Sequence, residues 1–174
     1  MENIDWQNLK FGYIPTNYNV RCYYGKWGEI EVSSETTLNI HMAATCLHYG
    51  QEAFEGLKAH GCKDGKVRIF RIKANAERLQ STCRGILMPE LPTDLFERMV
   101  KKVVELNREF VPPYGHDASL YIRPLLIGTS AQVGVHPATE YMFLIFVTPV
   151  GPYFKGGFAS SNYVIMRGYD RAAT

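Results

Sequence analysis

The sequence lacks the features that mark several common classes of protein. Its 174 residues carry 19 Lys and Arg against 17 Asp and Glu, and this net charge of +2 gives no electrostatic reason to expect a nucleic acid or an anionic membrane as partner. No apolar run approaches the roughly 20 residues that cross a bilayer. Residues 1–12 also lack the charged-then-apolar layout of a secretory signal. These absences predict a soluble cytoplasmic protein.

Cysteine is sparse too, and its spacing excludes further classes. Cys22, Cys46, Cys62 and Cys83 lie far apart and form no CxxC pair, so the sequence predicts buried free thiols in a reducing compartment rather than a zinc site or a redox pair. There is no metal-type grouping of His, Cys and Asp, no Gly-rich phosphate loop ahead of a helix and no GxSxG motif.

What the chain does contain indicates a globular fold rich in sheet. Hydrophobic residues make up 46% and charged residues 21%, which is ordinary for a globular domain. Tyr (11) and Phe (9) are plentiful, and this favours either a sheet or a pocket with aromatic walls. Alternation and turn residues predict strands over residues 19–27, 29–33, 37–40, 57–62, 67–72, 119–128 and 141–150.

Two helices are expected in the middle of the chain. The first begins at residue 74 or 75, after a hairpin turned by Asp64-Gly65, and runs to about residue 87. The second spans 95–110, with Asp94 as its cap and Glu97 completing a capping box. Its apolar face consists of Phe96, Met99, Val100, Val103, Val104 and Phe110.

The chain divides into a large and a small part. Residues 1–150 form one α+β domain, and residues 151–157 are rich in Pro and Gly, as in a linker. A fresh strand is expected over 161–168, so residues 158–174 are interpreted as the start of a second, truncated domain. A stub of this length cannot form a core of its own.

Candidate functional residues stand out where a charge or a glycine interrupts an apolar pattern. Arg123 lies inside the apolar strand YIRPLL and must be paired, exposed or pointed into a polar cavity, while Pro124 beside it suggests an edge position or the end of the strand. Arg78, early in a helix, is either a solvated arginine or a fork for a phosphate. In residues 47–59, an irregular connection, Gly50 and Gly56 allow a close approach of backbone or ligand.

Four segments in order resemble the N-terminal half of a branched-chain amino acid aminotransferase, a pyridoxal 5'-phosphate (PLP) enzyme of fold type IV. They are LHYGQEAFEGLKA, VRIFRIKANAERL, SLYIRPLLIG and PVGPYF. The resemblance implies that Arg78 holds the phosphate of PLP, with Arg171 near it, and that Arg123 lies beside the substrate pocket. It further implies that Val135 belongs to a loop that reaches the partner's pocket in a homodimer. The residues expected around the substrate side chain are Phe11, Tyr49, Phe54, Tyr121 and Tyr153.

The resemblance also implies an activity that this stretch cannot complete. Family members carry the lysine that forms a Schiff base with PLP a little beyond the point that matches Thr174, and Lys155 lacks the surroundings of that lysine. We therefore expect no catalytic residue within 1–174 and an inactive chain that does not retain PLP by itself. The full-length enzyme would transfer the amino group of Leu, Ile or Val to 2-oxoglutarate, with glutamate as product.

Other functions fit the same residues. A D-amino-acid aminotransferase or an aminodeoxychorismate lyase shares the fold type, although the bulky HYGQEAFEG stretch favours the branched-chain members. A non-enzymatic module could instead use Arg123 and the aromatic residues to bind a small apolar acid. Neither the preferred side chain nor the physiological direction of the reaction follows from the sequence.

Overall fold

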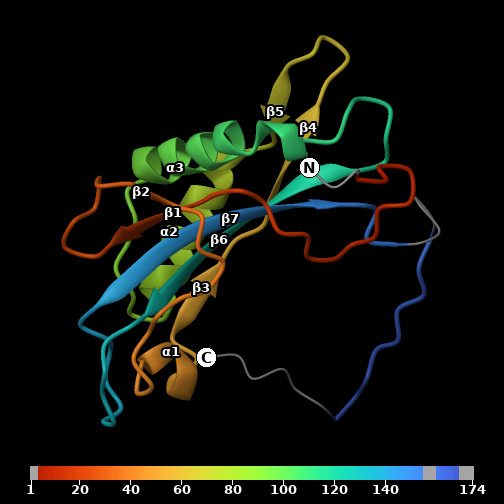
Figure 1. The fold of residues 1–174 in the computed structure, drawn as a ribbon. Helices are drawn as coiled ribbons and strands as arrows, with labels where there is room; N and C mark the ends of the chain where they lie inside the picture. The colour runs from red at the N-terminus through yellow and green to blue at the C-terminus, as the bar shows by residue number, and fades with distance from the viewer. Residues whose placement is uncertain (1–3, 155–159, 169–174) are drawn as a thin grey trace.

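The computed structural model describes residues 4–154 and 160–168, and its centre is an antiparallel sheet. In this part of the chain seven strands pair in the order β2-β1-β7-β6-β4-β5, and β3 pairs with β6 beside β4 (Figure 1). The strands are β1 (Asn19–Tyr23), β2 (Glu31–Ser33), β3 (Glu52–Phe54), β4 (Leu57–Gly61), β5 (Val67–Ile69), β6 (Ser119–Gly128) and β7 (Tyr141–Val150). The helical elements are α1 (Thr45–Tyr49), α2 (Ile72–Gly85), α3 (Thr93–Leu106) and the short 3₁₀ helix η1 (Arg108–Phe110). The expected α+β class is confirmed.

One face of the sheet carries the main core. Helix α3 buries its apolar side against β1, β6 and β7, and α2 packs against α3 and β3 (Figure 1). The six residues named for the apolar face of the second helix are all buried. The opposite face is covered only in part, by a small cluster in which Leu38 and Ile40 pack on Ile127, Met142 and Leu144. The remainder of that second face is therefore open for a site.

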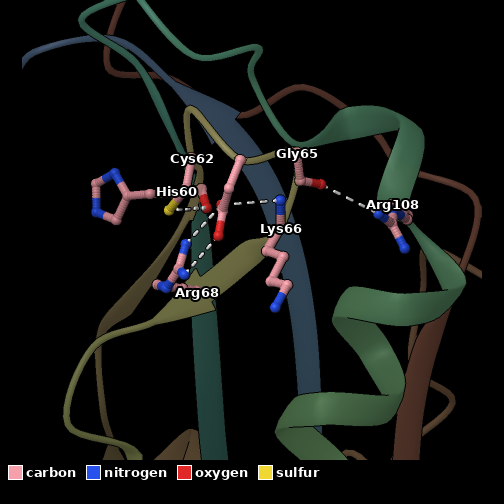
Figure 2. Close-up of polar contacts among 7 residues, drawn as sticks. His60, Cys62, Gly65, Lys66, Arg68 and Arg108 are labelled. Carbon is pink, nitrogen blue, oxygen red and sulfur yellow. Dashed lines mark hydrogen bonds and ion pairs between the residues drawn. The ribbon is translucent and has the colours of Figure 1, made fainter.

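The longest strands and the hairpin form as the sequence predicts. β6 and β7 pair along all ten residues, from Ser119 opposite Val150 to Gly128 opposite Tyr141. Figure 2 shows the tip of the β4–β5 hairpin, where both Nη atoms of Arg68 donate to the Asp64 carboxylate at 2.8 and 2.7 Å. Gly65 has φ 75°, the positive value that the Asp-Gly turn requires. Arg108 Nη2 donates to the Gly65 carbonyl at 3.4 Å and ties the turn to η1.

Several expected elements differ from the structure, and three of the differences have a clear physical reason. Residues 37–40 form no strand, because Leu38 and Ile40 lie across the second sheet face instead of pairing with its edge. α2 begins at Ile72, two residues earlier than expected, because β5 ends at Ile69 and Arg71 turns the chain in the left-handed region. Asp94 does not cap α3: Pro92 is the N-cap residue, and the Asp94 carboxylate lies 3.6 Å from Arg98 Nη2.

Two further expectations about strands are corrected. Pro124 is neither at an edge nor at a strand end: it lies in the middle of β6, between the residues that pair with β4 and those that pair with β3. A missing N–H is tolerated there because the neighbouring strand changes at this point. Residues 160–168 form no strand and are exposed, since no other described segment pairs with them. The division of the chain into 1–150, 151–157 and 158–174 stays a prediction.

Neither a membrane span nor a metal centre is found in the described residues. No helix within 4–154 and 160–168 is long and apolar enough to cross a bilayer. In the same ranges, no three His, Cys, Asp or Glu side chains are grouped so as to hold a metal ion. Of the four thiols, Cys22 and Cys83 are buried, and burial raises their pKa to about 12 and about 11 respectively. Cys46 and Cys62 are only half-buried, so the expectation of buried free thiols holds for two of the four.

Candidate active site

Arg123 lies among aromatic rings on the open face of the sheet. Along β6 the even-numbered residues are buried toward the helices, so Tyr121 and Arg123 turn to the other face. The guanidinium carbon of Arg123 is 4.6 Å from the ring centroid of Phe54 and 5.2 Å from that of Tyr121. Its Nε donates to the Tyr121 hydroxyl at 3.1 Å. The rings therefore stabilise this charge, by about 0.5–2 kcal/mol for each cation–π contact.

Phe11 and Tyr153 extend this arrangement from the two ends of the domain. The Phe11 ring centroid is 5.9 Å from that of Tyr121 and 5.1 Å from that of Tyr153. The two segments approach closely because Gly151 donates to the Lys10 carbonyl at 3.2 Å, and a Cβ at Gly151 would overlap the Leu9 carbonyl oxygen. We call the five residues Phe11, Phe54, Tyr121, Arg123 and Tyr153 the aromatic cluster.

The aromatic cluster has the composition of a binding site for a small acid with an apolar side chain. Phe11, Phe54 and Tyr153 are 43%, 59% and 68% exposed, so their rings have apolar surface left for a ligand. Among the ion pairs of the described residues, Arg123 takes part in none, so no carboxylate within them neutralises its charge. A ligand carboxylate can accept hydrogen bonds from this guanidinium.

Arg78 points toward the connection between β3 and β4. Its Nε and Nη2 donate to the two carboxylate oxygens of Glu55, at 2.7 and 2.6 Å. The Arg78 side chain is 67% exposed, whereas Glu55 is 3% exposed. The hydrogen bonds and the charge of Glu55 raise the pKa of Arg78, so the guanidinium stays charged at any ordinary pH.

A glycine joins the Arg78 pair to the aromatic cluster. Gly56 follows Glu55 directly, and a Cβ on it would lie 2.6 Å from the Tyr121 hydroxyl oxygen. Asn75 Nδ2 donates both to Glu55 Oε2 at 2.8 Å and to the Gly56 carbonyl at 3.3 Å. Gly56 therefore allows a close approach, but of the Tyr121 side chain and not of the expected backbone or ligand. Gly50 has another role: nothing lies within 4 Å of its Cβ position, and its φ of 60° ends α1 in the left-handed region.

Tyr49 and Val135 lie in a different place from the aromatic cluster. Both line a cavity formed by residues 49–52 and 135–137 together with Ile86 and Leu87, and the Tyr49 hydroxyl donates to the Val133 carbonyl. The cavity that Tyr49 and Val135 line includes neither Tyr121 nor Arg78. A pocket shared by these residues stays a prediction, and Arg171 lies outside the described residues.

Glu55 and Asn75 were missed in the sequence, although a signal for Glu55 is present. In the sequence Ala53, Leu57 and Ala59 place apolar residues at the same alternate positions as Glu55, and the structure buries all four on the inward side of an extended segment. An acidic residue on the buried phase of a strand pattern needs a cation, by the same argument that singled out Arg123. Asn75 carries no comparable signal, because the first turn of a helix accepts any polar residue.

Solved structures share this fold. The branched-chain amino acid aminotransferase of Escherichia coli matches 79% of the chain and 41% of its own length, with a TM-score of 0.62 and 23% sequence identity. The branched-chain amino acid aminotransferase of T.th., solved with pyridoxamine 5'-phosphate, matches 76% of the chain and 40% of its own length, with a TM-score of 0.57 and 23% identity. The fold is therefore that of part of a fold-type IV aminotransferase.

Sequence comparison leads to a particular family within this class. No model of a protein family matches the chain. The branched-chain-amino-acid aminotransferase of Haemophilus influenzae, however, is 51% identical over 175 residues, which cover 99% of this chain and 51% of that protein. The chain thus spans about half the length of this curated relative. It is homologous to the N-terminal half of branched-chain amino acid aminotransferases, as its motifs predict.

Proposed function

We propose that residues 1–174 provide the substrate wall and the phosphate-binding arginine of a PLP-dependent branched-chain amino acid aminotransferase. The full-length protein would transfer the amino group of Leu, Ile or Val to 2-oxoglutarate. One observation carries the proposal: Glu55-Gly56 brings the Arg78 guanidinium to the backbone segment against which Tyr121 of the aromatic cluster packs. A phosphate-binding fork and a pocket for an apolar acid would then lie side by side.

The residues present fit PLP at its phosphate end. Glu55 occupies the Nε–Nη2 edge of Arg78, and Nη1 makes none of the hydrogen bonds found among the described residues. An exposed guanidinium edge is suited to two oxygens of a phosphate. Arg171 is proposed as a second phosphate ligand on the resemblance alone. When bound, PLP supplies the electron sink that allows an α-proton of the amino acid to be removed.

The aromatic cluster would bind the side chain and the carboxylate of the substrate. Phe11, Phe54 and Tyr153 would exclude water and contact the branched aliphatic chain. Arg123, which Tyr121 holds through its hydroxyl, would orient a carboxylate of the amino acid or of 2-oxoglutarate. This chain's own residues thus bind and orient the substrate, and the residue that moves the proton is proposed to lie outside 1–174.

Tyr49 and Val135 are proposed to complete the pocket of a second subunit. Val135 is 87% exposed and Tyr49 is 44% exposed, and both lie apart from the aromatic cluster of their own chain. A homodimer would therefore give each apolar surface a partner. The cytoplasmic location likewise stays a prediction.

A substrate survey on the full-length protein tests the proposed activity. We expect amino transfer from L-leucine, L-isoleucine and L-valine to 2-oxoglutarate, measured as glutamate formed after PLP is added. A clear preference for D-alanine would assign the protein to the D-amino-acid aminotransferases. The absence of turnover with all four amino acids would favour a binding module.

The 174-residue chain itself should not bind PLP covalently. We expect no visible absorbance band of lysine-bound PLP after incubation with the cofactor and removal of its excess, because no lysine in this stretch matches the one that the resemblance requires. The full-length protein serves as the positive control. A strong band from residues 1–174 would show that a lysine within them reacts.

Substitution Gly56→Ala should damage substrate binding more than folding. The added methyl group overlaps the hydroxyl end of Tyr121, which can swing away at a cost of about 1 kcal/mol, but the Tyr121–Arg123 hydrogen bond is then lost. We expect the KM for leucine to rise several-fold in the full-length protein. Gly85→Ala is the matched control, because nothing lies within 4 Å of that Cβ position. Equal KM values for the two variants would refute the role of Tyr121.

A further inference from the structure

We propose that Glu55 is a positioning residue for the cofactor phosphate, which acts by fixing the orientation of Arg78. This inference rests on the proposed function, because it needs a phosphate at Arg78. It assigns a role to a residue that would not itself contact the ligand. The argument depends on the burial of Glu55, on the edge of Arg78 that it occupies and on the contacts that hold the carboxylate still.

The Glu55 carboxylate is the fixed partner of the pair. With 3% exposure it is a buried charge, and three donors satisfy it: Arg78 Nε at 2.7 Å, Arg78 Nη2 at 2.6 Å and Asn75 Nδ2 at 2.8 Å. Its backbone N–H donates to the Pro124 carbonyl in β6 at 3.0 Å. The carboxylate therefore cannot follow Arg78 toward solvent, so Arg78 must adapt to it.

Arg78 would not be ordered without this partner. Its side chain is 67% exposed, and the only side-chain hydrogen bonds found for it among the described residues are the two to Glu55. A free arginine samples many rotamers, and immobilising such a side chain on binding costs about 0.5–1.5 kcal/mol. The bidentate pair removes most of that freedom before a ligand arrives. It also leaves Nη1 and the outer hydrogen of Nη2 facing away from Glu55.

The charge of Glu55 has two opposing effects on a phosphate. The carboxylate repels an anion, which would make PLP bind more tightly when Glu55 is neutralised. The same carboxylate orients the fork, so that its neutralisation makes PLP bind more weakly. Because Arg78 is largely exposed, water and salt screen the repulsion. The orienting effect depends on short hydrogen bonds and is not screened, so we expect it to dominate.

The test compares PLP with pyridoxal, which lacks the phosphate, in the full-length protein. In Glu55→Gln the amide nitrogen would face one of the Arg78 donors, and the bidentate pair would be lost. We expect the dissociation constant of PLP, measured by fluorescence or absorbance titration, to rise roughly 2- to 13-fold, which is the range of one immobilised side chain. The constant for pyridoxal should stay unchanged.

Three further variants separate positioning from general damage. Glu77→Gln is the matched control, because Glu77 adjoins Arg78 in the sequence but its carboxylate pairs with Lys73 at the surface, at 3.8 Å. This variant should change neither the dissociation constant of PLP nor that of pyridoxal. Asn75→Ala removes one of the three donors to Glu55 and should raise the dissociation constant of PLP by a smaller factor than Glu55→Gln does. In an Arg78→Ala background, Glu55→Gln should no longer alter the ratio of the two constants.

The possible results lead to different conclusions. If Glu55→Gln lost the same affinity for PLP and for pyridoxal, Glu55 would have a structural role only. If Glu55→Gln bound PLP more tightly, repulsion would be the dominant effect. Either result overturns the inference and leaves the proposed function standing. If Glu55→Gln did not fold, an unchanged PLP constant in Asn75→Ala would overturn it instead. A wild-type protein that binds PLP no better than pyridoxal would overturn the proposed function as well.

Discussion

Replacement of Arg78 by alanine in the full-length protein is expected to weaken the retention of PLP by about 1.5–3 kcal/mol, or on the order of 10- to 100-fold. The variant removes the guanidinium whose outer edge, turned away from Glu55, is proposed to bind the phosphate. It also leaves the buried Glu55 carboxylate with Asn75 as its remaining side-chain donor. Equilibrium dialysis or titration of the apoprotein with PLP measures the loss directly.

Arg84→Ala is the matched control for this change. Arg84 lies in the last turn of the same helix, pairs with Glu90 at 2.6 Å and is 58% exposed, so its removal deletes a similarly exposed arginine whose carboxylate partner lies at the surface. It should leave PLP affinity unchanged. Unchanged affinity in Arg78→Ala itself would remove Arg78 from the cofactor site.

Replacement of Phe96 by alanine is expected to produce the largest loss of stability, about 3–5 kcal/mol of the free energy of unfolding. Phe96 is 1% exposed on α3, and its ring centroid is 5.9 Å from that of Phe143 in β7. Truncation leaves a cavity between the helix and the central strands that the packed core cannot fill. Denaturant unfolding of the 174-residue chain, with the m-value monitored, measures the change.

Phe70→Ala provides the comparison for the core substitution. Phe70 is 72% exposed between β5 and α2, so the same truncation at that position should change stability by about 0.5 kcal/mol or less. Similar losses at the two positions would mean that α3 does not pack on the sheet as described.

The predictions that succeeded concern segments whose pattern has a single structural reading. α3 shows its apolar stripe over fourteen residues, and β6 and β7 are long β-branched and aromatic runs, so periodicity alone identified them. The hairpin was recognisable because Asp64-Gly65 meets a specific requirement for positive φ. Errors occurred where the local pattern is ambiguous: residues 37–40 have strand-like alternation, yet their backbone pairs with no strand among the described residues.

The candidate site residues were chosen in two ways, from the local pattern of the sequence or from the resemblance to a known family. Arg123 was selected as a candidate because a charge in an apolar strand is costly unless it is compensated. The aromatic residues and Arg78 were identified by resemblance, because a ring or an exposed helical arginine has no distinctive local signal. What compensates each charge was not predictable. Phe54 and Tyr121, which flank Arg123, precede it by 69 and 2 residues in the sequence. Glu55, which pairs with Arg78, precedes it by 23 residues.

The sequence by itself determined the homology to the N-terminal half of branched-chain amino acid aminotransferases and the order of the main helices and strands, because these follow from periodicity, turn chemistry and motifs that are local to the chain. Only the tertiary structure decided that Gly56 makes room for Tyr121, that Glu55 occupies one edge of Arg78, and that Tyr49 and Val135 lie apart from the aromatic cluster. Such contacts join distant segments. They depend on how β3, β4 and β6 meet, and a local pattern does not encode that pairing.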